Sequence, residues 1–174
     1  LVHATNPDLI IITGDLVYGE FDDSGTSFRK YVRFMDRFRI PWAPIFGNHD
    51  NESLMGVDWQ CEILEKAGHS LFKRGNVTGN SNYTIGLKQG NAIKRVIYMM
   101  DSNGCGNTKD PKVKRAVGFA EDQLEWFDET AGRIGNGVKS FVCYHIPTEE
   151  FAMAAVSADY QKTPEENITY TIGT

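Results

Sequence analysis

Three apolar stretches of this chain each end in a short polar motif, and this pattern limits the folds that the chain can adopt. The stretch 42–46 leads into Gly47-Asn48-His49-Asp50, the stretch 9–13 into Gly14-Asp15, and the stretch 138–143 into Tyr144-His145-Ile146-Pro147. Short apolar runs bounded by glycine or proline are typical of buried strands. Because an open α/β sheet gathers its active site at strand ends, we expect the three motifs to meet at one place.

The sequence between the first two motifs predicts a helix. Phe28, Tyr31, Met35 and Phe38 recur at helical spacing, and Pro41 ends the pattern. A strand-helix-strand order implies a right-handed crossover and two parallel strands. The rest of the chain predicts further elements: a helix over 57–67, a hairpin of strands 82–87 and 93–100 with a turn at Gly90-Asn91, a loop over 103–117, a helix over 121–134 with Leu124, Phe127 and Ile134 inward, and a helix starting at 148–151.

Composition restricts the class of protein. At 174 residues with 41% hydrophobic content, we expect one domain over residues 1–174. The net charge of −5 argues against binding to nucleic acid, which needs a basic face. No apolar stretch approaches the roughly 20 residues of a membrane span. Asn-x-Ser/Thr tripeptides suit a secreted protein but also arise by chance, so they leave the compartment open; they begin at Asn51, Asn76, Asn82 and Asn167.

The polar motifs offer three side chains that bind metals. Asp15, Asn48 and His145 supply a carboxylate, an amide oxygen and an imidazole, a mixed set that suits cations in hydrolysis. Taken singly, Asp15 and Asn48 are common turn residues, and His145 could be a buried structural histidine. Their occurrence together, each after an apolar run, favours the ligand interpretation.

The order and spacing of these motifs resemble those of the calcineurin-like metallophosphoesterases, which include the purple acid phosphatases. Further matches resemble a fungal and plant branch of phosphatases: Ile40-Pro41-Trp42, Asp101-Ser102, Gln123 with Trp126-Phe127, and His145-Ile146-Pro147 continuing to Glu150-Phe151. The resemblance implies an α/β sandwich of two mixed β-sheets flanked by helices. Two of the family's five metal blocks, Asp-x-His at the start and Gly-His-x-His at the end, are absent, so we interpret the chain as an internal fragment of a longer enzyme.

The resemblance also implies roles for individual residues. Asp15 would bridge two metal ions (Fe, Mn or Zn), and Asn48 and His145 would bind one of them. A water or hydroxide activated by the metals would attack phosphorus. His49 would assist the leaving group, and Asp50 would keep its imidazole protonated and oriented. Tyr18 matches the tyrosinate ligand of true purple acid phosphatases, but the branch resembled carries other aromatic residues there, so its role stays open.

The resemblance to a phosphatase branch implies a phosphomonoesterase acting on a small phosphorylated substrate or a phosphoprotein. A phosphodiesterase is the alternative with the same chemistry, and a non-catalytic scaffold is the alternative if the absent blocks are degenerate. Because those blocks supply most ligands of one metal, we expect residues 1–174 alone to be inactive and to bind metal weakly.

Overall fold

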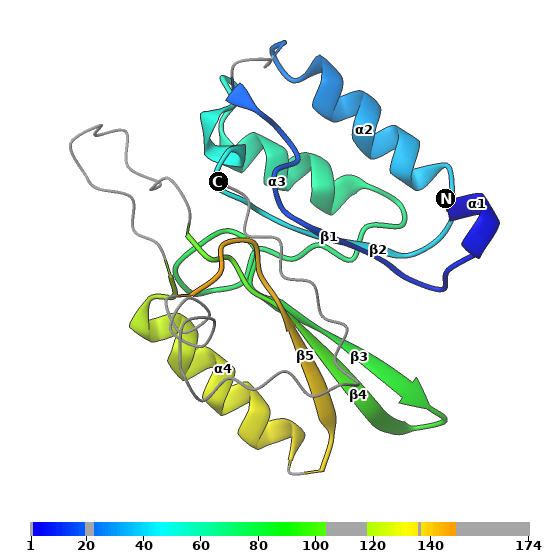
Figure 1. The fold of residues 1–174 in the computed structure, drawn as a ribbon, viewed down its shortest axis with the longest axis vertical. Coiled ribbons are helices and arrows are strands. Elements are labelled where there is room, and N and C mark those ends of the chain that lie inside the picture. Colours follow the sequence, from blue (N-terminus) through cyan, green and yellow to red (C-terminus); the bar gives the residue numbers. More distant parts are fainter. Residues whose placement is uncertain (1, 20–22, 104–117, 136, 149–174) are drawn as a thin grey trace, which may run out of the picture.

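The computed structural model describes residues 2–19, 23–103, 118–135 and 137–148, and these form an α/β structure (Figure 1). The expectations for 103–117 and for a helix starting at 148–151 fall mostly on residues outside these ranges. The elements follow in this order: α1 (Val2–Thr5), β1 (Ile10–Thr13), α2 (Thr26–Asp36), β2 (Trp42–Ile45), the 3₁₀ turn η2 (Asp50–Glu52), α3 (Val57–Lys66), β3 (Tyr83–Gln89), β4 (Ala92–Met99), α4 (Glu121–Ile134) and β5 (Lys139–Cys143).

The first sheet consists of β1 and β2, which pair in parallel as the strand-helix-strand pattern predicted. Ile10 is opposite Trp42 and Thr13 is opposite Ile45. All four residues of β2 are buried, whereas β1 alternates between half-buried and exposed residues, with Ile11 37% exposed. The expectation that the apolar run 9–13 forms a fully buried strand is therefore wrong for the described part of the chain, where β1 pairs only with β2.

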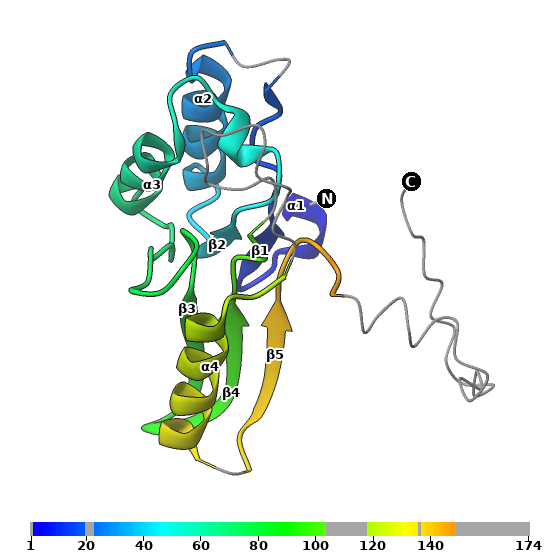
Figure 2. The ribbon, with the colours of Figure 1, turned by 90° about the vertical axis from the view of Figure 1, so that its left-hand side faces the viewer.

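The second sheet has the order β3-β4-β5 and is mixed, because β3 and β4 form the predicted antiparallel hairpin while β4 and β5 run parallel. Helix α4 lies along one face of this sheet (Figure 2). Val96, Tyr98 and Met100 point toward it and pack against residues that include Trp126 and Phe127. The alternation of side chains along β4 sends Ile97 and Met99 to the opposite face.

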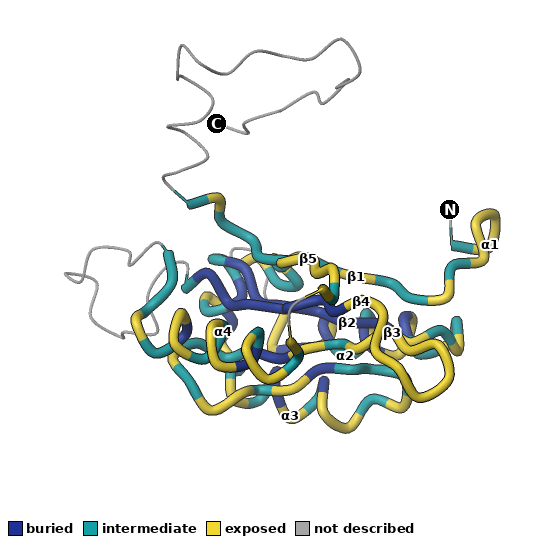
Figure 3. The backbone as a smooth tube through the Cα atoms, turned by 90° about the horizontal axis from the view of Figure 1, so that it is seen from below, coloured by how far each residue is buried: buried dark blue, intermediate teal, exposed yellow. Residues whose placement is uncertain are grey.

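The main core lies between β2, helices α2 and α3, and this second face of β4. Trp42, Phe46, Leu64 and Met99 are among its fully buried side chains. Figure 3 shows the buried backbone concentrated along β2 and the inner part of β4, with exposed residues on the outer helix surfaces and at the hairpin tip. Strand β4 thus packs against one hydrophobic core on each of its two faces.

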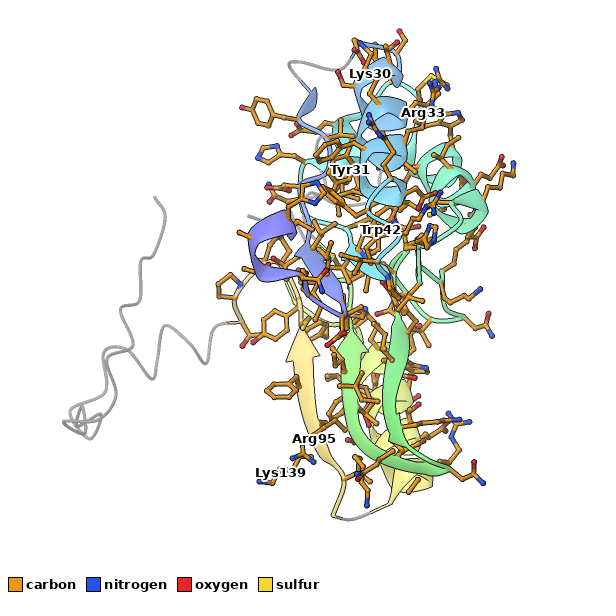
Figure 4. The ribbon with its side chains drawn as sticks, turned by 90° about the vertical axis from the view of Figure 1, so that its right-hand side faces the viewer. Lys30, Tyr31, Arg33, Trp42, Arg95 and Lys139 are labelled. Carbon is orange, nitrogen blue, oxygen red and sulfur yellow. The ribbon has the colours of Figure 1, made fainter. Side chains whose placement is uncertain are left out.

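Helix α2 is amphipathic, as the sequence predicted. Tyr31 meets Trp42 edge to face with ring centroids 6.3 Å apart, while Lys30 and Arg33 are exposed on the outside of the helix (Figure 4). At the far end of the second sheet, Arg95 and Lys139 are exposed and directly opposite each other on β4 and β5. Like charges in this position oppose strand pairing slightly.

The inward face of α4 differs from the prediction at one position. Leu124 was expected inside but is 50% exposed, and its neighbour Gln123 is fully buried. Gln123 Nε2 donates hydrogen bonds to Asn82 Oδ1 and to the Asp101 carbonyl oxygen, both at 2.8 Å. A buried amide with satisfied hydrogen bonds is stable in a core, and this contact fixes the helix rotation that turns Leu124 outward.

Candidate functional site

His145 lies just beyond the end of β5 and is held at two points. Its Nδ1 lies 2.7 Å from the carbonyl oxygen of Thr13, at the end of β1. Because a carbonyl oxygen can only accept, Nδ1 carries the proton. The next amide, Ile146 N–H, donates to Ser102 Oγ at 2.9 Å. Both contacts fix the direction of the imidazole and leave Nε2 as the nitrogen that can bind something else.

Asp15 and Asn48 both face this second nitrogen. Nε2 of His145 lies 3.2 Å from Asp15 Oδ2 and 3.1 Å from Asn48 Oδ1. The three side chains singled out as metal ligands in the sequence are therefore brought together from the ends of β1, β2 and β5. Two oxygen acceptors that both face Nε2 require a positive charge among them, which a bound cation or a proton on Nε2 supplies.

The spacing of these atoms also fits a cation. Ligand atoms held about 2.1 Å from a metal ion lie about 3.0–3.4 Å from one another in octahedral or tetrahedral arrangements. Within the described residues no three His, Cys, Asp or Glu side chains gather as a ligand group. The converging set contains one aspartate, one histidine and one asparagine. It therefore has fewer carboxylate and imidazole ligands than a complete metal site.

Asp15 adopts an unusual backbone conformation, with φ at 55°, in the left-handed region that few residues other than glycine occupy. Two hydrogen bonds hold it there: Asp15 N–H donates to Asp50 Oδ2 at 3.0 Å, and His49 N–H donates to Asp15 Oδ1 at 3.1 Å. Such conformations cost about 1–3 kcal/mol and persist where the surroundings impose them, often at functional sites.

The approach of the strand ends requires two glycines. A Cβ on Gly14 would lie 2.7 Å from His145 Nδ1 and 2.8 Å from the Gly47 Cα. A Cβ on Gly47 would overlap Asp15 Oδ1 and lie 2.9 Å from His145 Cδ2. Gly14 also has a φ of +103°. Any side chain at either position would push apart the strand ends that carry the three candidate ligands.

Asp50 is fully buried and binds backbone amides. Its Oδ2 accepts from Gly47 N–H at 2.6 Å as well as from Asp15, and its Oδ1 accepts from Val17 N–H at 3.0 Å. Burial raises the pKa of Asp50 to about 7, with the amides of Gly47 and Val17 acting in the opposite direction. The carboxylate that was expected to orient the His49 imidazole instead ties the loop after β1 to the loop after β2.

The His49 imidazole has a different acidic neighbour. Its Nδ1 lies 2.9 Å from Glu52 Oε1, an ion-pair distance without the alignment of an ideal hydrogen bond. The ring of Tyr18 stands edge to face on the imidazole, with centroids 4.5 Å apart. Sequence reasoning did not identify Glu52. The spacing of three residues could have indicated it, because side chains at i and i+3 lie on one side of a 3₁₀ turn.

A second buried carboxylate supports the loop that binds Ile146. Asp101 Oδ2 accepts from Asn80 N–H at 2.7 Å, and Oδ1 accepts from Asn103 N–H at 3.0 Å. Burial raises the pKa of Asp101, while these amides and the charge of His145 lower it.

Asn82, which begins one of the Asn-x-Ser/Thr tripeptides, belongs to the same cluster. Its side chain is buried, and its Nδ2 donates to the Thr78 carbonyl oxygen at 2.8 Å. It is therefore not accessible as a glycan acceptor in this structure.

The fold has two sheets and brings Asp15, Asn48 and His145 together at strand ends, and comparison with known proteins identifies its family. A model of the calcineurin-like phosphoesterases matches residues 1–169, so the chain belongs to this family. None of the helices in the described ranges has the length and apolar character that crossing a bilayer requires.

The curated relatives are fungal and plant proteins. The chain is 29% identical to the uncharacterized protein C1020.05 of Schizosaccharomyces pombe over 153 residues, which is 87% of this chain and 29% of that protein. It is 33% identical to phosphatase DCR2 of Saccharomyces cerevisiae over 109 residues, 56% of this chain and 19% of that protein. It is 25% identical to probable inactive purple acid phosphatase 28 of Arabidopsis thaliana over 176 residues, 86% of this chain and 44% of that protein. The chain thus spans less than half the length of these relatives.

Proposed function

We propose that this chain is part of a metal-dependent phosphatase that hydrolyses phosphate monoesters. The observation that carries the proposal is the convergence of Asp15 Oδ2 and Asn48 Oδ1 on Nε2 of His145, with Nδ1 already committed to Thr13. Membership of the calcineurin-like family supports phosphoester hydrolysis in general. The similarity to a yeast protein named as a phosphatase supports the choice of monoesters.

Asp15, Asn48 and His145 would hold one metal ion, and Asp15 alone would reach a second. Iron, manganese and zinc all suit a set of carboxylate, amide and imidazole ligands. When bound, such ions supply positive charge that neutralises the phosphoryl oxygens and lowers the pKa of water. The backbone hydrogen bonds to Asp15 and His145 orient both ligands in advance, so little ordering of the chain is needed on binding.

His49 is the residue proposed to assist the leaving group. It follows Asn48 directly, and its backbone N–H donates to the Asp15 carboxylate. Its imidazole is therefore tied by the main chain to the proposed ligands, and it can donate a proton to a departing oxygen nearby. Asp50, proposed from sequence as part of the catalytic group, acts in this proposal on the backbone, because it holds the amides of Asp15 and Gly47 in place.

Two alternatives remain within the family. A phosphodiesterase would use the same residues on a bulkier substrate. A non-catalytic scaffold is the reading favoured by the names of the plant relatives, which are called probable inactive purple acid phosphatases. In this chain Asp15, Asn48, His49 and His145 are all present, and the first, second and fourth converge. This convergence supports an active site over a scaffold.

The test compares esters with different leaving groups in the full-length protein. A nitrophenolate departs with little help, whereas an alkoxide needs a proton, and general acid assistance is worth typically 10²–10⁴-fold. His49→Ala should keep its metal content, retain much of its kcat/KM on aryl phosphates, and lose about 10²–10⁴-fold on alkyl phosphates. His3→Ala is the matched control, because His3 lies on α1, where it meets Phe38.

Three results would count against the proposal. An equal loss on both ester types would give His49 a role in binding or geometry. A loss of metal would make His49 a ligand. A metal-loaded parent protein that hydrolyses no phosphate ester would support the scaffold.

A further inference from the structure

The carboxylate of Glu52 connects the His49 side chain to the loop that follows β1. Its Oε1 lies 2.9 Å from His49 Nδ1, and its Oε2 accepts a hydrogen bond from Gly19 N–H at 3.0 Å. Each oxygen thus has its own neighbour. This arrangement differs from an ordinary exposed ion pair, in which two freely rotating side chains gain little from meeting.

The local backbone brings these groups together. The 3₁₀ turn η2 closes with Glu52 N–H donating to the His49 carbonyl oxygen at 3.0 Å. Gly19 leaves no room for a side chain, because a Cβ there would overlap the Glu52 Cβ and lie 2.8 Å from Oε2. The approach of Gly19 therefore holds the carboxylate in one direction before any substrate binds.

The other side of the imidazole is also restricted. The ring of Tyr18 lies edge to face on His49, with centroids 4.5 Å apart. The side chains of His49 and Glu52 keep only 28% and 35% of their exposure. The imidazole thus has an aromatic ring as one neighbour and a carboxylate as another. Tyr18, which supplies the ring, and Gly19, which holds the carboxylate, are consecutive in the chain.

We infer that Glu52 is the positioning residue for His49: its carboxylate holds a proton on Nδ1, so that Nε2 faces the substrate and, in the protonated imidazole, carries the proton given to the leaving group. This inference rests on the proposed role of His49 in leaving-group departure. Acidic partners of metal-bound histidines fix the tautomer and ring direction in this way, and their loss costs about 10–100-fold in activity or metal affinity; the Glu52 carboxylate is placed to act on the His49 imidazole likewise. Asp50, the acid next to His49 in sequence, cannot do so here because its oxygens bind backbone amides.

The first test reads the imidazole directly and needs no activity. In the full-length protein labelled with ¹⁵N-histidine, nitrogen-to-carbon-bound-proton couplings distinguish a proton on Nδ1 from one on Nε2, and the His49→Ala spectrum assigns the signal. In spectra recorded at a pH where the imidazole is neutral, we expect the Nδ1-protonated tautomer in the parent and a shift toward the Nε2-protonated tautomer in Glu52→Ala. An unchanged His49 signal in Glu52→Ala would overturn the inference.

The second test is kinetic and uses two substitutions. Glu52→Gln offers one carbonyl oxygen, which can serve Gly19 N–H or His49 Nδ1 but not both. We expect Glu52→Ala and Glu52→Gln to lower kcat on alkyl phosphates by about 10–100-fold, with metal content and the rate on aryl phosphates largely retained. Glu62→Gln is the matched control, because Glu62 is exposed on α3 and pairs with Lys66.

The two tests separate this inference from the proposed function. If the parent protein hydrolyses no ester, the proposed function fails, while the His49 spectrum still supports or overturns the Glu52 contact. If the parent is active and Glu52→Ala keeps full activity on alkyl phosphates, Glu52 does not position His49 for the reaction, whatever the spectrum shows.

Discussion

Replacing Gly47 by alanine tests whether the close approach of β1, β2 and β5 builds the site. Gly47 has no positive φ, so an alanine there meets no backbone penalty and adds only one methyl group. That methyl carbon would overlap Asp15 Oδ1 and lie 2.6 Å from the Asp15 nitrogen. The effect of this substitution is therefore steric, and it falls on a proposed metal ligand.

The expected cost follows from what can move. A carbon and a nitrogen in contact normally lie about 3.4 Å or more apart, so the Asp15 backbone or the end of β2 must shift by about 0.8 Å. The carboxylate could rotate, but the Asp15 backbone is held by its hydrogen bond to Asp50. Overpacking of this kind costs typically about 1–3 kcal/mol. In a domain of this size that corresponds to a fall of about 2–12 °C in Tm.

The assay measures urea unfolding and metal binding of three proteins: the parent, Gly47→Ala and Gly132→Ala. A Cβ on Gly132, within α4, meets nothing within 4 Å, so that substitution should raise stability by up to about 1 kcal/mol through helix propensity. Gly47→Ala should lose stability and bind metal more weakly. If Gly47→Ala matched the parent in both respects, the strand ends would not be packed as described, and the account of the site would be wrong.

Two further predictions concern other parts of the structure. Burial alone would raise the pKa of Asp36, but hydrogen bonds from Trp42 Nε1 and from the amides of Gly68 and His69 lower it below 3.8. This carboxylate therefore adds stability above pH 3.8 that is lost as the pH falls through the lowered pKa. Asp36→Asn should be less stable than the parent at pH 7 and should lose less stability on acidification, as measured by urea unfolding between pH 2 and 7. An equal loss of stability in acid in both proteins would contradict this prediction. In the full-length protein, His145→Ala should lose metal and activity together and Asn48→Ala should lose less of both, by elemental analysis and rate; activity lost with metal retained in His145→Ala would remove it from the ligand set.

Much of the fold follows from local pattern. The apolar run 42–46 predicted β2, and the spacing of Phe28 and Met35 predicted α2. Both predictions were correct because positions that face the core require apolar residues, and these residues are buried in the structure. Leu124 was misplaced because hydrophobicity alone ranks it above Gln123 for burial. The partners that make Gln123 the buried residue, Asn82 and Asp101, lie 41 and 22 residues earlier in the chain, and periodicity within a helix carries no information about them.

The candidate site shows the same division. Motif order indicated that Asp15, Asn48 and His145 would meet, and they do. The partners of His49 and Asp50 could not be predicted from motif order. The sequence around Asp50 does not indicate which groups its carboxylate binds. Its three amide donors become visible only when the loops after β1 and β2 are placed together. Adjacency in sequence favoured Asp50 as the acid beside the His49 imidazole, whereas a 3₁₀ turn brings Glu52 there.

The central claim is that Asp15, Asn48 and His145 bind one metal ion, and anomalous X-ray scattering from crystals of the full-length protein tests it most directly. Data collected on either side of the iron, manganese and zinc absorption edges locate and identify each ion. We predict a peak about 2.0–2.2 Å from His145 Nε2 and at similar distances from Asp15 and from Asn48 Oδ1. A catalytically active, metal-loaded crystal with no anomalous peak among these three side chains would contradict the account.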